Sequence, residues 1–178
     1  MERDRSQGAG FAAGVGAGGR GVGVNTGGIQ VGGIHRRGAE NSEAPQREVT
    51  EKIIGAAIEV HRLMGPGLLE SVYQQSLQIE LSLRGIQFLA QAPVALVYKG
   101  HVMAAPLKLD LLVEGVVIVE IKALQALEPV HTAQLLTYLR LTGLTSGLLL
   151  NFNDITLKQG IQRVSNSLRP SAFSAPLR

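Results

Sequence analysis

The order of the predicted elements in this chain is typical of an α+β or mixed α/β domain. Two helical patterns come first, three strand patterns follow, and a helix, a strand and a short helix complete the order. Strands grouped between helices in this way bury their apolar faces by layering helices on a sheet. With 178 residues the chain can bury one core, so we expect a single folded domain.

The two ends of the chain differ in composition from its middle. Residues 1–45 contain 13 of the 22 glycines and almost no large apolar side chain. Such a segment cannot bury enough surface to offset its backbone entropy, so we expect a disordered tail over residues 1–47. Residues 167–178 contain serine, proline and arginine and are expected to fray as a second tail. The folded domain is therefore expected over residues 48–166.

Two helices are predicted at the start of this domain. Thr50 can cap the first helix, and residues at helical spacing continue it to the GPG at 65–67: Ile53, Ile54, Ala57, Ile58 and His61. The second helix is expected from about Leu69 to Arg84, where Gly85 ends it.

Glu70 heads a column of core residues in the second helix. Tyr73, Leu77 and Leu81 follow it at i+3, i+7 and i+11, which places all of them on one stripe. An ionised glutamate is rarely buried unless a cation or hydrogen-bond donors meet it. Either this end of the helix is solvated, or a positive group lies opposite Glu70.

Three strands follow the two helices, with turn signals at Lys99–Gly100 and at Glu114–Gly115. Pro129 and Gly143 then bound a further helix. The expected elements are strands at 87–98, 102–113 and 116–123, a helix at 130–142, a strand at 148–152 and a short helix near 157–166.

Three charged residues interrupt the apolar strands of the second hairpin. Glu120 and Lys122 are two residues apart and share one strand face, and Asp110 lies on the neighbouring strand. Burying these charges is costly unless they neutralise one another or hold a cation. The simpler alternative is an edge hairpin whose charges face water. The apolar flanks VVIV and LDLLV favour a functional site.

The register of this hairpin decides whether the two carboxylates meet. A two-residue loop at Glu114 and Gly115 would pair Asp110 with Val119 and turn the carboxylates to opposite faces. A three-residue loop or a bulge pairs Asp110 with Glu120 instead, and Gly115 can supply the positive φ that a bulge requires. We therefore predict an odd loop or a bulge.

The helix at 130–142 carries a polar stripe, because His131, Gln134 and Tyr138 lie at i, i+3 and i+7. Gln and Tyr can donate hydrogen bonds to a phosphate or to water. The alternative is an ordinary helix surface with one half-buried tyrosine, but the charged hairpin favours function. His61 and His131 have no spaced partner for zinc, so each is expected to be packed or hydrogen-bonded.

Composition restricts the partners of the chain. Without cysteine it has neither disulfides nor thiolate zinc sites, so a metal must be held by oxygen or imidazole, and we expect a cytoplasmic protein. From Glu48 onward 11 basic residues stand against 10 acidic ones, so local geometry or a metal must hold nucleic acid. Charges break the apolar runs well short of the roughly 18 residues of a membrane span, and no membrane partner is expected.

Five blocks occur in order along the chain: EVHRLMGPG with GLLESVY, LDLLVEG, VIVEIKA, HTAQLLTYLRLTG and GLLLNFN. Together they resemble the GxxExxY proteins, a branch of the PD-(D/E)XK nuclease superfamily, over about residues 48–166. The resemblance implies a PD-(D/E)XK nuclease-like core. In this core N-terminal helices precede a three-strand antiparallel meander, a helix, a further strand and a short C-terminal helix.

The resemblance also implies roles for individual residues. Asp110 and Glu120 resemble the two metal-binding acids, and Lys122 completes the ExK element. Glu70 resembles an additional metal-binding carboxylate, which could face inward toward a cation. Mg²⁺ or Mn²⁺ prefers such hard oxygen ligands, and the carbonyl of Ile121 can add another.

The implied function is metal-dependent hydrolysis of phosphodiester bonds in nucleic acid. Gln134 and Tyr138 resemble a QxxxY motif that would orient substrate or water. The residues do not separate DNA from RNA, and we favour DNA as the partner. One alternative is a catalytically inactive module of the same fold that binds nucleic acid or a protein, and another is a structural ion cluster without a ligand.

Overall fold

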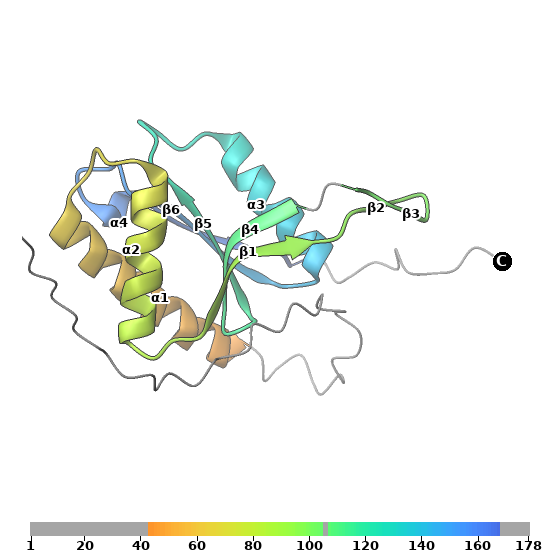
Figure 1. Ribbon diagram of the computed structural model, residues 1–178, viewed down its shortest axis with the longest axis horizontal. Coiled ribbons are helices and arrows are strands. Elements are labelled where there is room, and N and C mark those ends of the chain that lie inside the picture. The colour runs from red at the N-terminus through yellow and green to blue at the C-terminus, as the bar shows by residue number, and fades with distance from the viewer. Residues whose placement is uncertain (1–42, 105–106, 168–178) are drawn as a thin grey trace, which may run out of the picture. The chain divides into compact units, whose positions relative to one another are not determined.

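The computed structural model describes residues 43–104 and 107–167, which form a five-stranded sheet with helices on both of its faces (Figure 1). The expected tails lie outside these residues, apart from the first residues of the first helix and Ser167. The elements in chain order are α1 (Glu43–Met64), α2 (Glu70–Leu83), β1 (Phe88–Val94), β2 (Val97–Tyr98), β3 (His101–Val102), β4 (Leu107–Val113), β5 (Val117–Lys122), α3 (Pro129–Thr142), β6 (Ser146–Asn151), α4 (Leu157–Gly160) and β7 (Ile161–Ser165).

The strands of the main sheet lie in the order β1-β4-β5-β6-β7. Neighbouring strands are antiparallel except β5 and β6, which are parallel because α3 carries the chain back between them. Figure 1 shows α1 and α2 together on one side of the sheet and α3 on the other. The structure is therefore mixed α+β, with helices before a mostly antiparallel sheet, as the sequence predicts.

Two apolar cores lie on opposite faces of the sheet. The α1–α2 core contains Tyr73 and Val119, and the α3 core contains Ile118 and Leu135. Successive residues of β5 alternate between these cores, since side chains of a strand alternate in direction. The first five side chains of β5, including Glu120 and Ile121, are all buried, and only the last one, Lys122, is partly exposed. Of the charged residues predicted for function, Glu120 thus lies on the enclosed part of β5.

α1 begins at Glu43, so the prediction of Thr50 as its cap is wrong. The hydroxyl of Thr50 donates a hydrogen bond to the carbonyl of Gln46 at 2.7 Å. A threonine that bonds the carbonyl four residues earlier is satisfied inside a helix and does not require a terminal position. None of the helices in the described part of the chain is both long and apolar enough to cross a membrane.

The long hairpin predicted from strands 87–98 and 102–113 is divided in two. β1 pairs with β4 in the main sheet, whereas β2 and β3 pair with each other in a separate hairpin. Lys99 and Gly100 have φ values of 48° and 82° and form the predicted turn. β1 lies at the edge of the sheet, so the chain can leave it there without breaking a second ladder.

The helix predicted near 157–166 ends early. α4 is a single turn that ends at Gly160, and the residues after it form β7, which pairs antiparallel with β6. The prediction of a helix to residue 166 is wrong because β6 offers its backbone groups to a further strand. Val164 is buried in the α3 core between exposed neighbours, which is the alternation of a strand.

Candidate functional site

The β4–β5 register brings two acidic residues opposite each other. Leu111 pairs with Val119, and the same register continued by one residue puts Asp110 across from Glu120. The loop between the strands has three residues, 114–116, and two of them have positive φ. The odd loop predicted from the sequence is confirmed.

Asp110 lies where β4 changes its orientation. Leu109 is buried in the α3 core but Leu111 is buried in the α1–α2 core, although residues two apart on a regular strand share a face. Oδ2 of the half-buried Asp110 accepts a hydrogen bond from the backbone N–H of Ile121 at 2.9 Å. The pairing of β4 with β5 ends at Leu111, and beyond this point the carboxylate of Asp110 takes the place of a backbone carbonyl as acceptor for the N–H of Ile121.

Gln91 is a residue of this site that the sequence did not reveal. It lies opposite Asp110 in the register of β1 and β4, and its Nε2 donates to Oδ1 of Asp110 at 3.3 Å. Its φ of 49° is in the left-handed region, which non-glycine residues rarely adopt. Residues in such strained conformations are found most often at functional sites. No sequence signal marks Gln91, because this conformation depends on the pairing with β4.

Glu120 and Lys122 form a buried ion pair on β5. The Glu120 side chain is 4% exposed and the Lys122 side chain 14%, and 2.8 Å separates Oε1 from Nζ. The second carboxylate oxygen of Glu120, Oε2, is buried and has no hydrogen-bond partner among the described residues. Because an unpaired buried carboxylate oxygen is costly, this atom is the unsatisfied point of the site.

Burial and neighbouring charges shift the pKa values of both members of the pair. Burial, followed by the negative charge of Asp110, raises the pKa of Glu120 from 4.5 to about 6, against the hydrogen bond and charge of Lys122. Burial disfavours the charged form of Lys122, but the hydrogen bond and charge of Glu120 outweigh it. Glu70 and Asp110 add to this effect, and the pKa of Lys122 is raised. At neutral pH the site therefore holds more negative than positive charge.

Glu70 is the first residue of α2, and its side chain is exposed. The residues behind it, Tyr73, Leu77 and Leu81, are fully buried, which confirms the predicted column. Of the two explanations for Glu70, the structure has the solvated helix end, and the inward-facing Glu70 is not observed. Its position suits a carboxylate because the N-terminus of a helix carries partial positive charge. Its charge still raises the pKa of Glu120, so it acts on the site electrostatically.

Tyr73 anchors the loop that leads to Glu70. Its hydroxyl donates to the carbonyl of Gly65 at 2.7 Å and accepts from the backbone N–H of Leu68 at 3.0 Å. Its ring stacks on Phe152, with 4.7 Å between ring centroids. The tyrosine of GLLESVY therefore has a structural role in holding the GPG loop against the core.

Gln134 and Tyr138 are brought together on α3. Nε2 of Gln134 donates to the Tyr138 hydroxyl at 2.8 Å. Tyr138 is buried in the α3 core with Ile118, on the side of β5 to which strand alternation also assigns Glu120. The two polar residues and the buried carboxylate therefore belong to the same face of the sheet.

The two histidines are hydrogen-bonded, as expected, and lie outside this group. Nε2 of His61 lies 2.9 Å from the carbonyl oxygen of Asp154. Nδ1 of His131 accepts from the backbone N–H of Glu128 in a capping box at the start of α3. His131 thus caps the start of α3, whereas Gln134 and Tyr138, the other members of the predicted polar stripe, bond each other.

Within residues 43–104 and 107–167, no three acidic or histidine side chains are grouped closely enough to hold a metal ion. Glu70 therefore does not complete a three-carboxylate group with Asp110 and Glu120. The two hairpin carboxylates nevertheless fit a divalent metal in their chemistry. They offer hard oxygen atoms, and their like negative charges repel each other. The buried Oε2 of Glu120 also lacks a partner in this part of the chain. The carbonyl of Ile121 belongs to the same stretch of β5.

The chain is held firmly where it leaves Lys122. The backbone N–H of Phe152 donates to the Lys122 carbonyl at 2.8 Å. The side chain of Asn151, which is fully buried, bonds both the N–H and the carbonyl of Leu124 at 2.9 Å. Asn151 is a second residue that sequence reasoning missed. A polar residue directly after the apolar run LLL was the signal that could have identified it.

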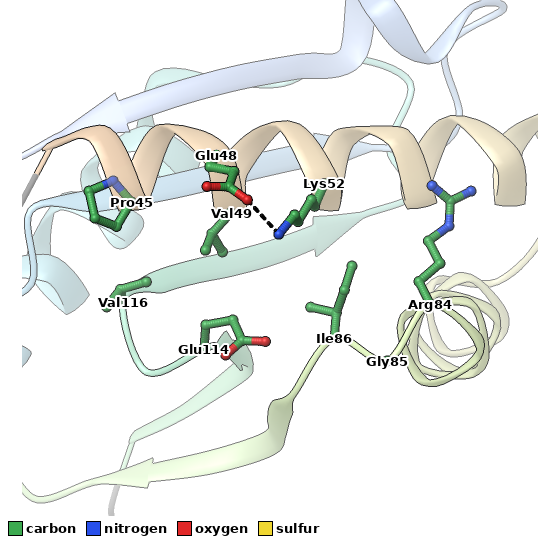
Figure 2. A pocket seen from close by; sticks show the side chains of 9 residues that line it. All are labelled: Pro45, Glu48, Val49, Lys52, Arg84, Gly85, Ile86, Glu114 and Val116. Carbon is green, nitrogen blue, oxygen red and sulfur yellow. Dashed lines mark ion pairs between the residues drawn. The ribbon is translucent and has the colours of Figure 1, made fainter.

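A pocket of about 580 Å³ lies at the turn end of the β4–β5 hairpin (Figure 2). Figure 2 shows Glu48 and Lys52 paired on α1, with Glu114 from the turn and Arg84 from the end of α2 beside the same space. None of the predicted site residues lines this pocket. The buried charges of the site therefore lie apart from this open space.

One of three comparisons with known proteins finds a match. Residues 47–164 match the family model of the PD-(D/E)XK nuclease superfamily. Comparisons with curated proteins and with solved structures give no match. Since the family model spans more than half of the sequence and includes the charged hairpin, the chain belongs to the PD-(D/E)XK nuclease superfamily.

Proposed function

We propose that the protein is a nuclease that hydrolyses phosphodiester bonds of nucleic acid with a divalent metal ion. The observation that carries this proposal is the buried Oε2 of Glu120, which lacks a partner in the described residues and lies on the strand opposite Asp110. A cation is a partner that would offset two neighbouring carboxylates. The chain's superfamily supports the same chemistry.

The residues of the hairpin divide the chemistry between them. Asp110 and Glu120 would hold Mg²⁺ or Mn²⁺, and the carbonyl of Ile121 would add an oxygen ligand, while the exposed Glu70 would act on the site through its charge. Such a metal lowers the pKa of water and offsets the charge that develops on the phosphate. Lys122 keeps its proton, since its pKa is raised, and its ammonium can donate a hydrogen bond to the attacking water or to the developing oxyanion.

Gln134 and Tyr138 would orient the substrate or the attacking water. The Tyr138 hydroxyl accepts a hydrogen bond from Gln134, which leaves its own proton to donate to a phosphate oxygen. This pair follows the QxxxY pattern. Together with GLLESVY and VIVEIKA it supports the GxxExxY branch as the subfamily of this chain.

A catalytically inactive module of the same fold is the second candidate function. Two observations favour it: Glu70 is exposed, and the described residues contain no group of three ligand side chains. Such a module would bind nucleic acid or a protein partner at the same face without cleaving it.

Cleavage of labelled single- and double-stranded DNA and RNA, with and without Mg²⁺ or Mn²⁺, tests the proposal. We expect metal-dependent cleavage, with DNA as the favoured substrate. Asp110→Asn and Glu120→Gln should each reduce the rate at least about a hundredfold, because each removes a charge that the metal requires. Asn at position 110 keeps an oxygen acceptor for the N–H of Ile121, so the fold should persist.

Glu114→Gln is the matched control, because Glu114 is an exposed acid at the other end of the same hairpin. It should cleave at the parental rate. Thermal unfolding separates the two candidates without using activity: Mg²⁺ should stabilise the parent protein and the Glu114 variant but not the Glu120 variant. Equal stabilisation of all three, or none, together with absence of cleavage, would favour the inactive module.

A further inference from the structure

The hairpin formed by β2 and β3, residues 95–104, has paired strands but no core of its own. The backbone N–H of Met103 donates to the carbonyl of Leu96 at 2.8 Å, which extends the two-stranded ladder. Val97, Val102 and Met103 are nevertheless exposed, and Tyr98 is 64% exposed. Figure 1 shows the hairpin extending beyond the ends of β1 and β4. A two-stranded hairpin is marginal alone in water, so these exposed side chains require an explanation from function.

The turn of this hairpin presents a tyrosine and a lysine together. Nζ of Lys99 lies 5.5 Å from the centroid of the Tyr98 ring, which is a cation–π contact. Lys99 adopts a φ of 48°, although asparagine or glycine is preferred at such a turn position. A left-handed lysine at an exposed turn keeps a positive charge in place at some conformational cost.

The surroundings of the hairpin are suited to a polyanion. No aspartate or glutamate occurs between Gly85 and Asp110, whereas Lys99, His101 and Lys108 do. Lys99, His101 and Lys108 are all exposed. An exposed aromatic ring among basic side chains is the combination that binds single-stranded nucleic acid, because bases stack on the ring and phosphates contact the cations.

The hairpin leaves the main sheet at the end where the candidate site lies. It joins Val94 of β1 to Leu107 of β4, which pair with each other. Asp110 follows three residues after Leu107, and β5 runs antiparallel to β4, so Glu120 lies toward the same end of the sheet. The β4–β5 turn lies at the opposite end.

We propose that the β2–β3 hairpin is a contact arm for single-stranded nucleic acid, in which Tyr98 stacks on a base and Lys99 contacts a phosphate. This proposal rests on the proposed nuclease function, because it assigns the arm to the substrate of that site. An unpaired strand is the favoured ligand, since the bases of a duplex are already stacked on one another and offer no face to Tyr98.

Fluorescence anisotropy with short labelled oligonucleotides tests the arm without cleavage when EDTA is present. The probes are single-stranded DNA, RNA of the same sequence and the DNA duplex. Tyr98→Val keeps a strand-forming residue, and Lys99→Asn keeps a residue that tolerates positive φ. Arg140→Gln is the matched control, because Arg140 is exposed near the end of α3, where the chain returns to the start of β6 at the other end of the sheet.

We expect Tyr98→Val to weaken binding of the single strands about tenfold. Lys99→Asn should reduce the slope of log K against log salt by about 0.7, the value for one phosphate contact on a single strand. Arg140→Gln should bind as the parent does. Circular dichroism should give the same melting temperature for the parent, the three single variants and the Tyr98→Val/Lys99→Asn double variant.

Three results would overturn the proposal: no binding of any probe by the parent, parental affinity in the Tyr98→Val/Lys99→Asn double variant, or equal weakening by Arg140→Gln. A change of oligomeric state in the double variant with unchanged affinity would also overturn it and would make the arm a protein contact. If the arm variants lose binding while the parent protein never cleaves with any metal, the arm stands and the nuclease proposal fails.

Discussion

Two Glu–Lys pairs of nearly equal length behave in opposite ways. The pair of Glu48 and Lys52 spans 2.7 Å on the surface of α1, and that of Glu120 and Lys122 spans 2.8 Å inside the sheet. The hydrogen bond and charge of Lys52 lower the pKa of Glu48, whereas burial and then Asp110 raise the pKa of Glu120 to about 6. The surroundings of an ion pair, and not its length, therefore decide how its acid titrates.

The same contrast separates the two ends of the β4–β5 hairpin. At the turn end, an open pocket of about 580 Å³ is bordered by charges that water can solvate (Figure 2). At the other end, a carboxylate oxygen of Glu120 is enclosed without a partner in the described residues. Solvated charges around a hollow are ordinary, but a protein retains a buried unmatched charge only at a cost. For this reason, the end of the hairpin with Glu120 is a better candidate for function than the pocket at its turn.

Replacement of each lysine by methionine is the strongest test of this contrast. Lys122→Met should lower the free energy of unfolding by about 3–5 kcal/mol, because it leaves the buried carboxylate of Glu120 without its cation. Lys52→Met should leave stability unchanged within error, since Glu48 remains solvated. Urea denaturation at pH 7 measures both. Equal losses in the two variants would contradict the assignment of Lys122 to a buried pair.

The pH dependence of stability should show the raised pKa of Glu120. The pKa is about 6 in the folded protein and 4.5 in its ordinary state, so between these values the folded protein binds more protons than the unfolded chain. The contribution of Glu120 to stability therefore falls as pH rises through this window, by about 2 kcal/mol in total. Denaturant midpoints at a series of pH values, with EDTA present, measure the effect.

Glu120→Gln is the control for this titration, because glutamine has nearly the same shape and does not titrate. The difference between parent and variant should change between pH 4.5 and about 6 and be constant outside that range. A difference that does not vary with pH would mean that Glu120 titrates at its ordinary pKa. The surface acid Glu48 should not cause stability to fall as pH rises, since its pKa is lowered.

The smallest expected effect concerns two left-handed residues, Gln91 on β1 opposite Asp110 and Glu114 in the β4–β5 turn. Gln91→Gly should relieve about 1–2 kcal/mol of backbone strain in the folded state. Glycine also loses more conformational entropy on folding, which costs about 0.5–1 kcal/mol, so the free energy of unfolding should rise by about 0.5 kcal/mol. Cleavage should nevertheless fall about two- to tenfold, because Asp110 loses a hydrogen bond.

Glu114→Gly makes the matching change at the turn end, where φ is 51°. It should leave the rate of cleavage unchanged, since the side chain of Glu114 bonds the backbone N–H of Gln87, far from Asp110, and the backbone N–H of Glu114 keeps its bond to the Gln87 carbonyl. Parental cleavage by Gln91→Gly, measured with the same DNA and Mg²⁺, would show that Asp110 needs no positioning from β1. Reduced cleavage in both variants would point to a general effect on the sheet.

The central hairpin could be predicted from the sequence because its constraints are local. Apolar flanks forced the strands of Asp110 and Glu120 into the core, and the requirement that the carboxylates meet forced an odd loop, which the register confirms. The column behind Glu70 followed in the same way from helical spacing. In each case, residues close in sequence carried all of the information.

Other features were not predicted because they depend on partners that are distant in the sequence. β7 forms because β6 presents an open edge, and residues 161–165 carry only a weak strand pattern of their own. Gln91 adopts its left-handed conformation opposite Asp110, where β4 changes face. Local sequence has no access to such pairings.

The single parallel pair in the sheet has a consequence for how the protein is made. β5 finds its neighbour β4 before it in the chain, but β6 follows only after α3. A nascent polypeptide that has reached Lys122 therefore lacks β6, the strand on which Leu149 pairs with Glu120, and the parallel ladder can form only after α3 has been made. Translation thus places the closure of the charged centre among the last steps of the domain's maturation on the ribosome.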